Sequence, residues 1–161
     1  MTVTTIEVSK EYLHFAAAHF TIFSATEREN LHGHNFHVQL EVTAPVGSDG
    51  LTFDYNILKN SLKALCDAHD EKTLMPADSP HLTFETDNQY QYVLFADERI
   101  PFLPRDVMLL PIRNVTVEEL SEYFLKRMVE HPDIAAEDIH QIVLRCSSGE
   151  GQWARAVWNA G

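Results

Sequence analysis

The stretch LHGHNFHVQLEVTAPVGSDG, residues 31–50, decides the fold of this chain. Apolar and polar residues alternate from His34 to Ala44, which is typical of a β-strand with one face on a core, and PVGSDG then supplies a turn. The preceding segment, residues 3–20, mixes β-branched and aromatic residues in partial alternation. We therefore expect two strands that pair as a hairpin.

Helical periodicity replaces this alternation at two places downstream. Asp54 stands as an N-cap before residues that recur every three or four positions, namely Leu58, Leu62, Leu65, Cys66 and His69. Thr116 and Glu119 have the spacing of a capping box, and Pro132 ends the apolar stripe that follows them, namely Leu120, Tyr123, Phe124 and Met128. Both segments predict amphipathic helices.

The remaining segments predict further β-structure. Three short apolar stretches, LTFET, YQYVLFA and DVMLLP, lie between Pro76 and Pro111 and predict a small β excursion. Residues 139–146 and 153–158 predict a final pair of strands. The order β-β-α-(β)-α-β-β, without a repeat or a linker, indicates one α+β domain over residues 1–161 with an antiparallel sheet.

Composition narrows the class of protein. The formal net charge of -12 argues against a broad basic surface for nucleic acid or an anionic membrane. The N-terminus lacks a signal-peptide pattern, and no apolar run approaches the roughly 20 residues of a membrane span. The two cysteines, Cys66 and Cys146, are too few for a disulfide framework. We expect a cytoplasmic protein in which both cysteines pack in the core.

Three histidines predict a metal site. His32 and His34 stand two apart on a strand, so the pleat points both imidazoles to one face. His19, which ends the preceding strand, comes close to them if the two strands pair. His37 and His14 have the opposite parity and should face away. Three neutral imidazoles with an open fourth position are the ligand set of catalytic zinc.

The motifs FAAAHF, LHGHNFHV, LTFDYNILK, HDEKTLMP and NVTVEEL occur in that order along the chain. In these motifs the chain resembles the 6-pyruvoyl tetrahydropterin synthase and 6-carboxytetrahydropterin synthase family. The resemblance implies one Zn²⁺ per subunit on His19, His32 and His34, and a lyase acting on 7,8-dihydroneopterin triphosphate in queuosine, folate or biopterin biosynthesis. It also implies the T-fold (tunnelling fold), with two helices on one face of the sheet. Subunits of that fold form a ring-type homo-oligomer, here expected to be a hexamer, with sites at subunit interfaces.

The chain departs from the family at the catalytic base. The segment ATERENLHGH lacks the cysteine that the family places before its HGH motif, and Glu27 and Glu29 are the available bases. A branch of the family with glutamate near that place cleaves the side chain to 6-hydroxymethyl-7,8-dihydropterin. The alternative for both glutamates is an acidic surface turn.

Two other functional positions also differ from the family. The family's Asp-His proton relay resembles Asp70-Glu71 here, with His69 one place early, and the alternative is a solvated helix end. The glutamate that anchors the pterin ring aligns with Cys146, and Glu150 lies nearby. Thr116 assists the ring in this comparison, although its capping role explains it without a ligand. Arg28 and Lys72 meet the triphosphate or are surface charges.

Three functions remain open at this point. The first is a zinc-dependent synthase acting on 7,8-dihydroneopterin triphosphate, with glutamate-based cleavage of the side chain as its variant. The second is a zinc-containing relative that binds a pterin or purine without turnover. The third is an interaction module in which the zinc is structural.

Overall fold

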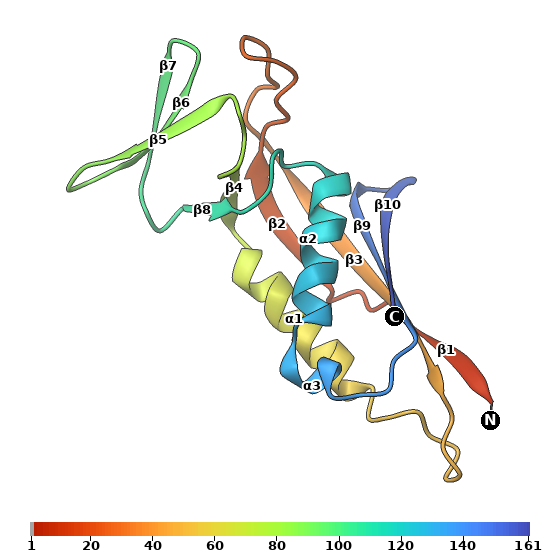
Figure 1. Cartoon of the computed structure of the whole chain (residues 1–161). Coiled ribbons are helices and arrows are strands. Elements are labelled where there is room, and N and C mark those ends of the chain that lie inside the picture. The colour runs from red at the N-terminus through yellow and green to blue at the C-terminus, as the bar shows by residue number, and fades with distance from the viewer. Residues whose placement is uncertain (1) are drawn as a thin grey trace.

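The computed structural model describes residues 2–161, and its main layer is a seven-stranded sheet (Figure 1). Its strands follow the order β10-β9-β3-β2-β4-β8, and β1 pairs with β3 off this path. The long strand β3 lies at the centre because it pairs with three neighbours. The bounds are β1 Val3–Val8, β2 His14–His19, β3 His32–Pro45, β4 Lys72–Pro76, β8 Val107–Leu110, β9 Gln141–Gly149 and β10 Gln152–Asn159.

The predicted hairpin forms, but its first arm is two strands rather than one. β2 pairs antiparallel with the first half of β3, from His19 opposite His32 to His14 opposite His37. β1 pairs with the second half of the same strand. Residues 9–13 interrupt the arm with a turn, in which the N–H of Leu13 donates a hydrogen bond to the carbonyl of Lys10. The interruption lets two short strands cover one edge of β3.

The expectation of an antiparallel sheet is wrong at one end. β4 runs parallel to β2, and β8 runs parallel to β4, so the sheet is mixed. Parallel neighbours need a crossover connection, and the helix between β3 and β4 supplies part of it. The last two strands pair antiparallel as predicted.

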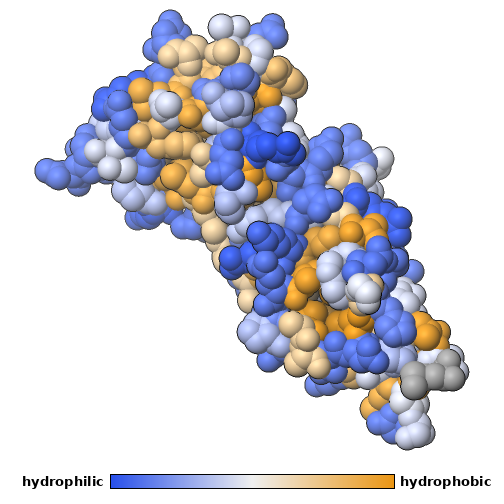
Figure 2. Space-filling model, in the orientation of Figure 1, coloured by the Kyte–Doolittle hydropathy of each residue, from blue (hydrophilic) through white to orange (hydrophobic). Residues whose placement is uncertain are grey.

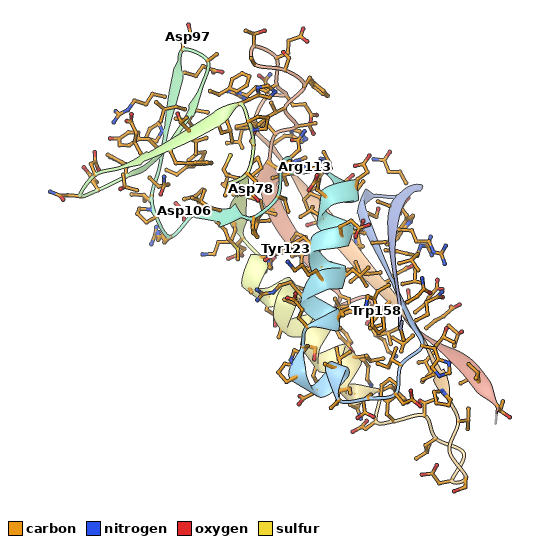
Figure 3. The ribbon with its side chains drawn as sticks, in the orientation of Figure 1. Asp78, Asp97, Asp106, Arg113, Tyr123 and Trp158 are labelled. Carbon is orange, nitrogen blue, oxygen red and sulfur yellow. The ribbon has the colours of Figure 1, made fainter. Side chains whose placement is uncertain are left out.

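Two main helices, α1 (Asn56–His69) and α2 (Val117–Val129), cover one face of this sheet, as predicted (Figure 1). Thr116 is the N-cap of α2, and its side chain accepts the N–H of Glu119. The Glu119 carboxylate pairs with Arg113, labelled in Figure 3, so only half of the capping box forms. The N-cap of α1 is Tyr55 rather than Asp54, whose carboxylate accepts the N–H of Asn56. A short helix, α3 (Pro132–Ala135), follows α2.

The β excursion is a separate three-stranded sheet of β5 (Leu82–Thr86), β6 (Gln91–Phe95) and β7 (Glu98–Phe102). Two of the predicted stretches are β5 and β6, β7 was not predicted, and DVMLLP contributes β8 to the main sheet. The small sheet has its own core, which includes Phe20 and Ile22 from the loop after β2. Apolar residues gather over this part of the molecule in Figure 2.

The core between sheet and helices is continuous and includes Phe15, Phe36, Leu62 and Phe124. Within residues 2–161, no helix is long and apolar enough to cross a membrane.

Candidate metal centre

His19, His32 and His34 converge at the end of the β2–β3 ladder. His19 lies directly opposite His32, and His34 lies two residues further along the same face. One donor atom from each imidazole lies within 4.8 Å of the other two. Nε2 of His32 lies 3.0 Å from Nε2 of His34. The predicted cluster therefore exists in the fold.

Backbone carbonyls orient two of the three rings. Nδ1 of His19 lies 2.7 Å from the carbonyl of Val115, which precedes α2. Nδ1 of His32 lies 2.7 Å from the carbonyl of Asn30. A carbonyl only accepts, so each Nδ1 carries the proton and each Nε2 presents a lone pair to the cluster. This is the outer-shell arrangement that orients histidine ligands of metals.

The ring nitrogens that face the cluster show whether these residues can bind a metal. Nε2 of His19 is buried and has no hydrogen-bond partner, and among residues 2–161 it is the one buried side-chain nitrogen or oxygen of which this is true. Such an atom is costly unless something binds it. Tetrahedral zinc with bonds of about 2.0–2.1 Å places two nitrogens about 3.3 Å apart, close to the separation of His32 and His34. The cluster can bind a metal ion.

Burial keeps two of these imidazoles neutral. Desolvation lowers the pKa of His19, which is 5% exposed, although its hydrogen bond to Val115 opposes the shift. Burial also lowers the pKa of His34, and the neighbouring His32 adds to the effect. Neutral imidazole is the form that binds a metal, so the fold favours the ligand state at neutral pH.

Glu29 lies beside the cluster, and Glu27 lies away from it. Oε2 of Glu29 is 3.8 Å from Nε2 of His32, and its Oε1 accepts the N–H of Thr21 at 2.9 Å. Hydrogen bonding to the side chain and then the backbone of Thr21 lowers the pKa of Glu29, against the effect of burial. The side chain of Glu27 is exposed at the loop tip, where its carbonyl accepts the N–H of Phe23.

The predicted relay residues occupy three different environments. His69 is 1% exposed, where Nδ1 bonds to the carbonyl of Leu65 and Nε2 lies 3.2 Å from the hydroxyl of Tyr123, labelled in Figure 3. Asp70 accepts the N–H of Ala16 at 2.8 Å. Glu71 has a left-handed backbone with φ of 57°. The structure thus places His69 in the core and the two acids at the end of α1.

Glu71 and His34 line the same cavity, which has a volume of about 620 Å³. Small residues of β2 and β3, including Ala16 and Gly33, form its floor. Lys72 lies on its wall and donates from Nζ to the carbonyl of Arg105 at 2.6 Å. Because Ala16 and Gly33 alternate with His19, His32 and His34 along the paired strands, this cavity lies on the face of the ladder opposite to the three imidazoles.

The predicted substrate-binding residues are not gathered in one place. Thr116 follows Val115 and serves as the cap of α2. Cys146 is fully buried, and burial raises the pKa of its thiol to about 12. Glu150 is exposed at the turn between β9 and β10 and lines a different cavity, of about 290 Å³, with Trp153.

Sequence reasoning missed the residues that hold the site together. Asn114 donates from Nδ2 to the carbonyl of Ile22 at 2.8 Å and accepts its N–H at 3.1 Å. The adjacent carbonyl of Val115 orients His19. The motif NVTVEEL contains both residues, but nothing in it indicates that they contact a loop more than 90 positions earlier.

Comparisons with known proteins agree with this geometry. The 6-pyruvoyl tetrahydropterin synthase family matches residues 7–156. A Methanocaldococcus jannaschii protein with the assignment 6-carboxy-5,6,7,8-tetrahydropterin synthase is 27% identical over 144 residues, 88% of each chain.

Solved structures extend the likeness to the fold. The 6-pyruvoyl tetrahydropterin synthase of Plasmodium falciparum is 30% identical, with a TM-score of 0.92 over 99% of this chain and 100% of that one. The Plasmodium vivax enzyme, in a variant whose catalytic glutamate is replaced by alanine, is 26% identical with the same TM-score and coverage. This chain belongs to the 6-pyruvoyl tetrahydropterin synthase family.

Proposed function

We propose that this protein is a zinc-dependent lyase of the 6-pyruvoyl/6-carboxytetrahydropterin synthase type that acts on 7,8-dihydroneopterin triphosphate. The observation that carries the proposal is the convergence of three imidazoles with the carboxylate of Glu29. The names of the relatives and the family support the pterin substrate.

His19, His32 and His34 would hold the zinc. When bound there, zinc would polarise the oxygens of the substrate side chain and make a neighbouring proton easier to remove. Glu29 is the base that takes this proton, because its carboxylate lies beside the cluster and its orientation is fixed by Thr21. The Plasmodium vivax enzyme, whose catalytic residue is also a glutamate, supports this assignment.

Glu71 and Asp70 are the candidates for the proton relay. The support for Glu71 is its place in the family pattern, because the cavity that it lines lies on the face of the ladder opposite to the imidazoles. Asp70 is held by the N–H of Ala16, so its role is to fix the end of α1 and the direction of Glu71.

A second reaction, cleavage of the side chain to 6-hydroxymethyl-7,8-dihydropterin, is favoured by the nature of the base. Both cysteines are fully buried in the core, and neither belongs to the histidine cluster. Hydrogen bonding to Thr21 lowers the pKa of Glu29, which favours its ionised carboxylate. The available base is therefore a carboxylate rather than a thiolate, as in the branch of the family that cleaves the side chain.

Product analysis tests both reactions. Zinc-loaded protein is incubated with 7,8-dihydroneopterin triphosphate, and the pterin products are separated by mass spectrometry. A 6-pyruvoyl or 6-carboxy product supports the first reaction, and 6-hydroxymethyl-7,8-dihydropterin supports the second. Saturable binding of the substrate without any of these products would contradict both and support a non-catalytic pterin-binding protein.

We further propose that the subunits form a ring through their sheets, as the fold family implies. β10 is an end strand of the main sheet and offers its backbone for pairing. Sedimentation equilibrium should report a hexamer. A monomer at micromolar concentration would contradict this assembly.

A further inference from the structure

The loop that carries Glu29 is attached to the small sheet by Arg28. The guanidinium of Arg28 makes a two-pronged pair with Glu98 of β7, with Nε 3.1 Å from Oε1 and Nη2 2.9 Å from Oε2. It also lies over the ring of Phe20, 4.4 Å from the centroid, and 5.8 Å from that of Phe95. Only 15% of the Arg28 side chain is exposed. Such planar, two-pronged pairs are the geometrically specific kind of ion pair.

The same guanidinium also holds the backbone of the neighbouring glutamate. Nη1 of Arg28 donates to the carbonyl of Glu29 at 2.7 Å. The backbone of Arg28 forms a β-bridge with Ile22, and the N–H of Glu29 donates to the carbonyl of Thr21 at 2.9 Å. The peptide that carries the Glu29 side chain is therefore fixed on both sides, by its own loop and by the small sheet.

We propose that Arg28 is a positioning residue, and that the Arg28–Glu98 pair makes the small sheet a support for the carboxylate of Glu29. The proposal rests on the proposed function of Glu29 as the base. The guanidinium of Arg28 already contacts four partners, namely Glu98, Phe20, Phe95 and the carbonyl of Glu29. It is therefore not available to bind a triphosphate. Small displacements of a base reduce the rate of proton transfer more than they reduce substrate binding.

The small sheet offers a matched control pair. Arg99 of β7 pairs with Glu85 of β5 at 3.2 Å, and both side chains are about half exposed. Glu85→Gln therefore makes the same chemical change as Glu98→Gln in the same sheet, without touching the loop of Glu29.

The experiment compares wild type, Glu98→Gln, Arg28→Lys and Glu85→Gln as zinc-loaded full-length proteins. Turnover of 7,8-dihydroneopterin triphosphate gives kcat and KM, and amide hydrogen exchange reports on residues 21–29. We expect Glu98→Gln and Arg28→Lys to lower kcat by about tenfold or more, with KM and zinc content nearly unchanged. Their amides at residues 21–29 should exchange faster, and Glu85→Gln should resemble wild type in every measurement.

Unchanged kcat and unchanged exchange in Glu98→Gln and Arg28→Lys would overturn the positioning role. An equal loss in Glu85→Gln would also overturn it, because the effect would then belong to the small sheet in general. A wild-type protein without turnover refutes the proposed function instead. In that case hydrogen exchange alone decides whether Arg28 fixes the loop.

Discussion

The carboxylate of Glu29 lies 3.8 Å from the imidazole of His32, measured from Oε2 to Nε2. Two residues earlier, Glu27 lies at the exposed tip of the same loop. The difference arises because the loop closes on itself between Thr21 and Glu29, which directs one glutamate to the cluster and the other to solvent.

Replacing these two glutamates tests which of them is the base. Glu29→Gln removes the carboxylate that accepts the proton, so we expect turnover to fall on the order of 10²–10⁴-fold, with zinc retained. Glu27→Gln makes the same change at the loop tip and should leave turnover nearly unchanged. Steady-state kinetics decide the point, and an equal loss in both variants would reject Glu29 as the base.

Much of the fold follows from periodicity, but two strands do not. β3 alternates because one of its faces meets the helices, and this pattern is visible in the sequence. β4 shows three consecutive buried residues and no alternation, because both of its faces are covered: Leu74 packs in the main core and Met75 in the core of the small sheet. β7 contains Pro101, which argues against a strand, yet β7 lies at an edge of the small sheet where proline is tolerated.

Stability should fall in acid because His69 is buried as a neutral imidazole. Burial lowers its pKa below the ordinary value of 6.5, so below about that pH the unfolded chain binds a proton that the folded chain does not. Stability is therefore fully present above pH 6.5 and declines as the pH falls towards the folded pKa. One extra proton on the unfolded chain changes the free energy of unfolding by about 1.4 kcal/mol per pH unit.

Urea denaturation of zinc-free protein between pH 8 and pH 5 measures this effect. His69→Gln should make the pH dependence shallower, although His19 and His34, whose pKa values burial also lowers, should leave part of it. His81→Gln changes an exposed histidine and serves as the control. A pH dependence that is identical in wild type and His69→Gln would refute the assigned role of burial.

The two thiols should be inert in the folded protein. Burial raises the pKa of both Cys66 and Cys146 to about 12, so neither forms a thiolate near neutral pH. A colorimetric thiol reagent at pH 8 should label neither cysteine until denaturant is added, and then both. Rapid labelling of Cys146 in the folded state would show that it faces a solvent-filled site, as a pterin-binding role requires.

Thr116 can be tested as a helix cap separately from any role in substrate binding. Thr116→Ala removes the acceptor for the N–H of Glu119 and should lower the free energy of unfolding by about 1 kcal/mol. Thr116→Ser keeps the hydroxyl and should restore most of that stability. KM for the substrate is measured in both variants, and a raised KM in Thr116→Ala at unchanged stability would assign the hydroxyl to the ligand instead.

The site, like the fold, was only partly predictable from the sequence, because some of its contacts join segments that are far apart in the chain. The pairing of His19 with His32 follows from strand parity, which is local information. The choice between Glu27 and Glu29 depends on how the loop folds, and the orientation of His19 depends on a carbonyl at Val115. Contacts of a backbone carbonyl carry no side-chain signal, so the sequence does not reveal them.

Zinc content is the measurement that tests the central claim most directly. Purified wild type should contain one zinc per chain, and so should His37→Ala, because His37 lies on the same strand but on the opposite face. His34→Ala should contain almost none while its far-ultraviolet circular dichroism stays close to that of wild type. Full zinc retention in His34→Ala, or a wild-type protein that binds no zinc, would contradict the three-histidine metal centre.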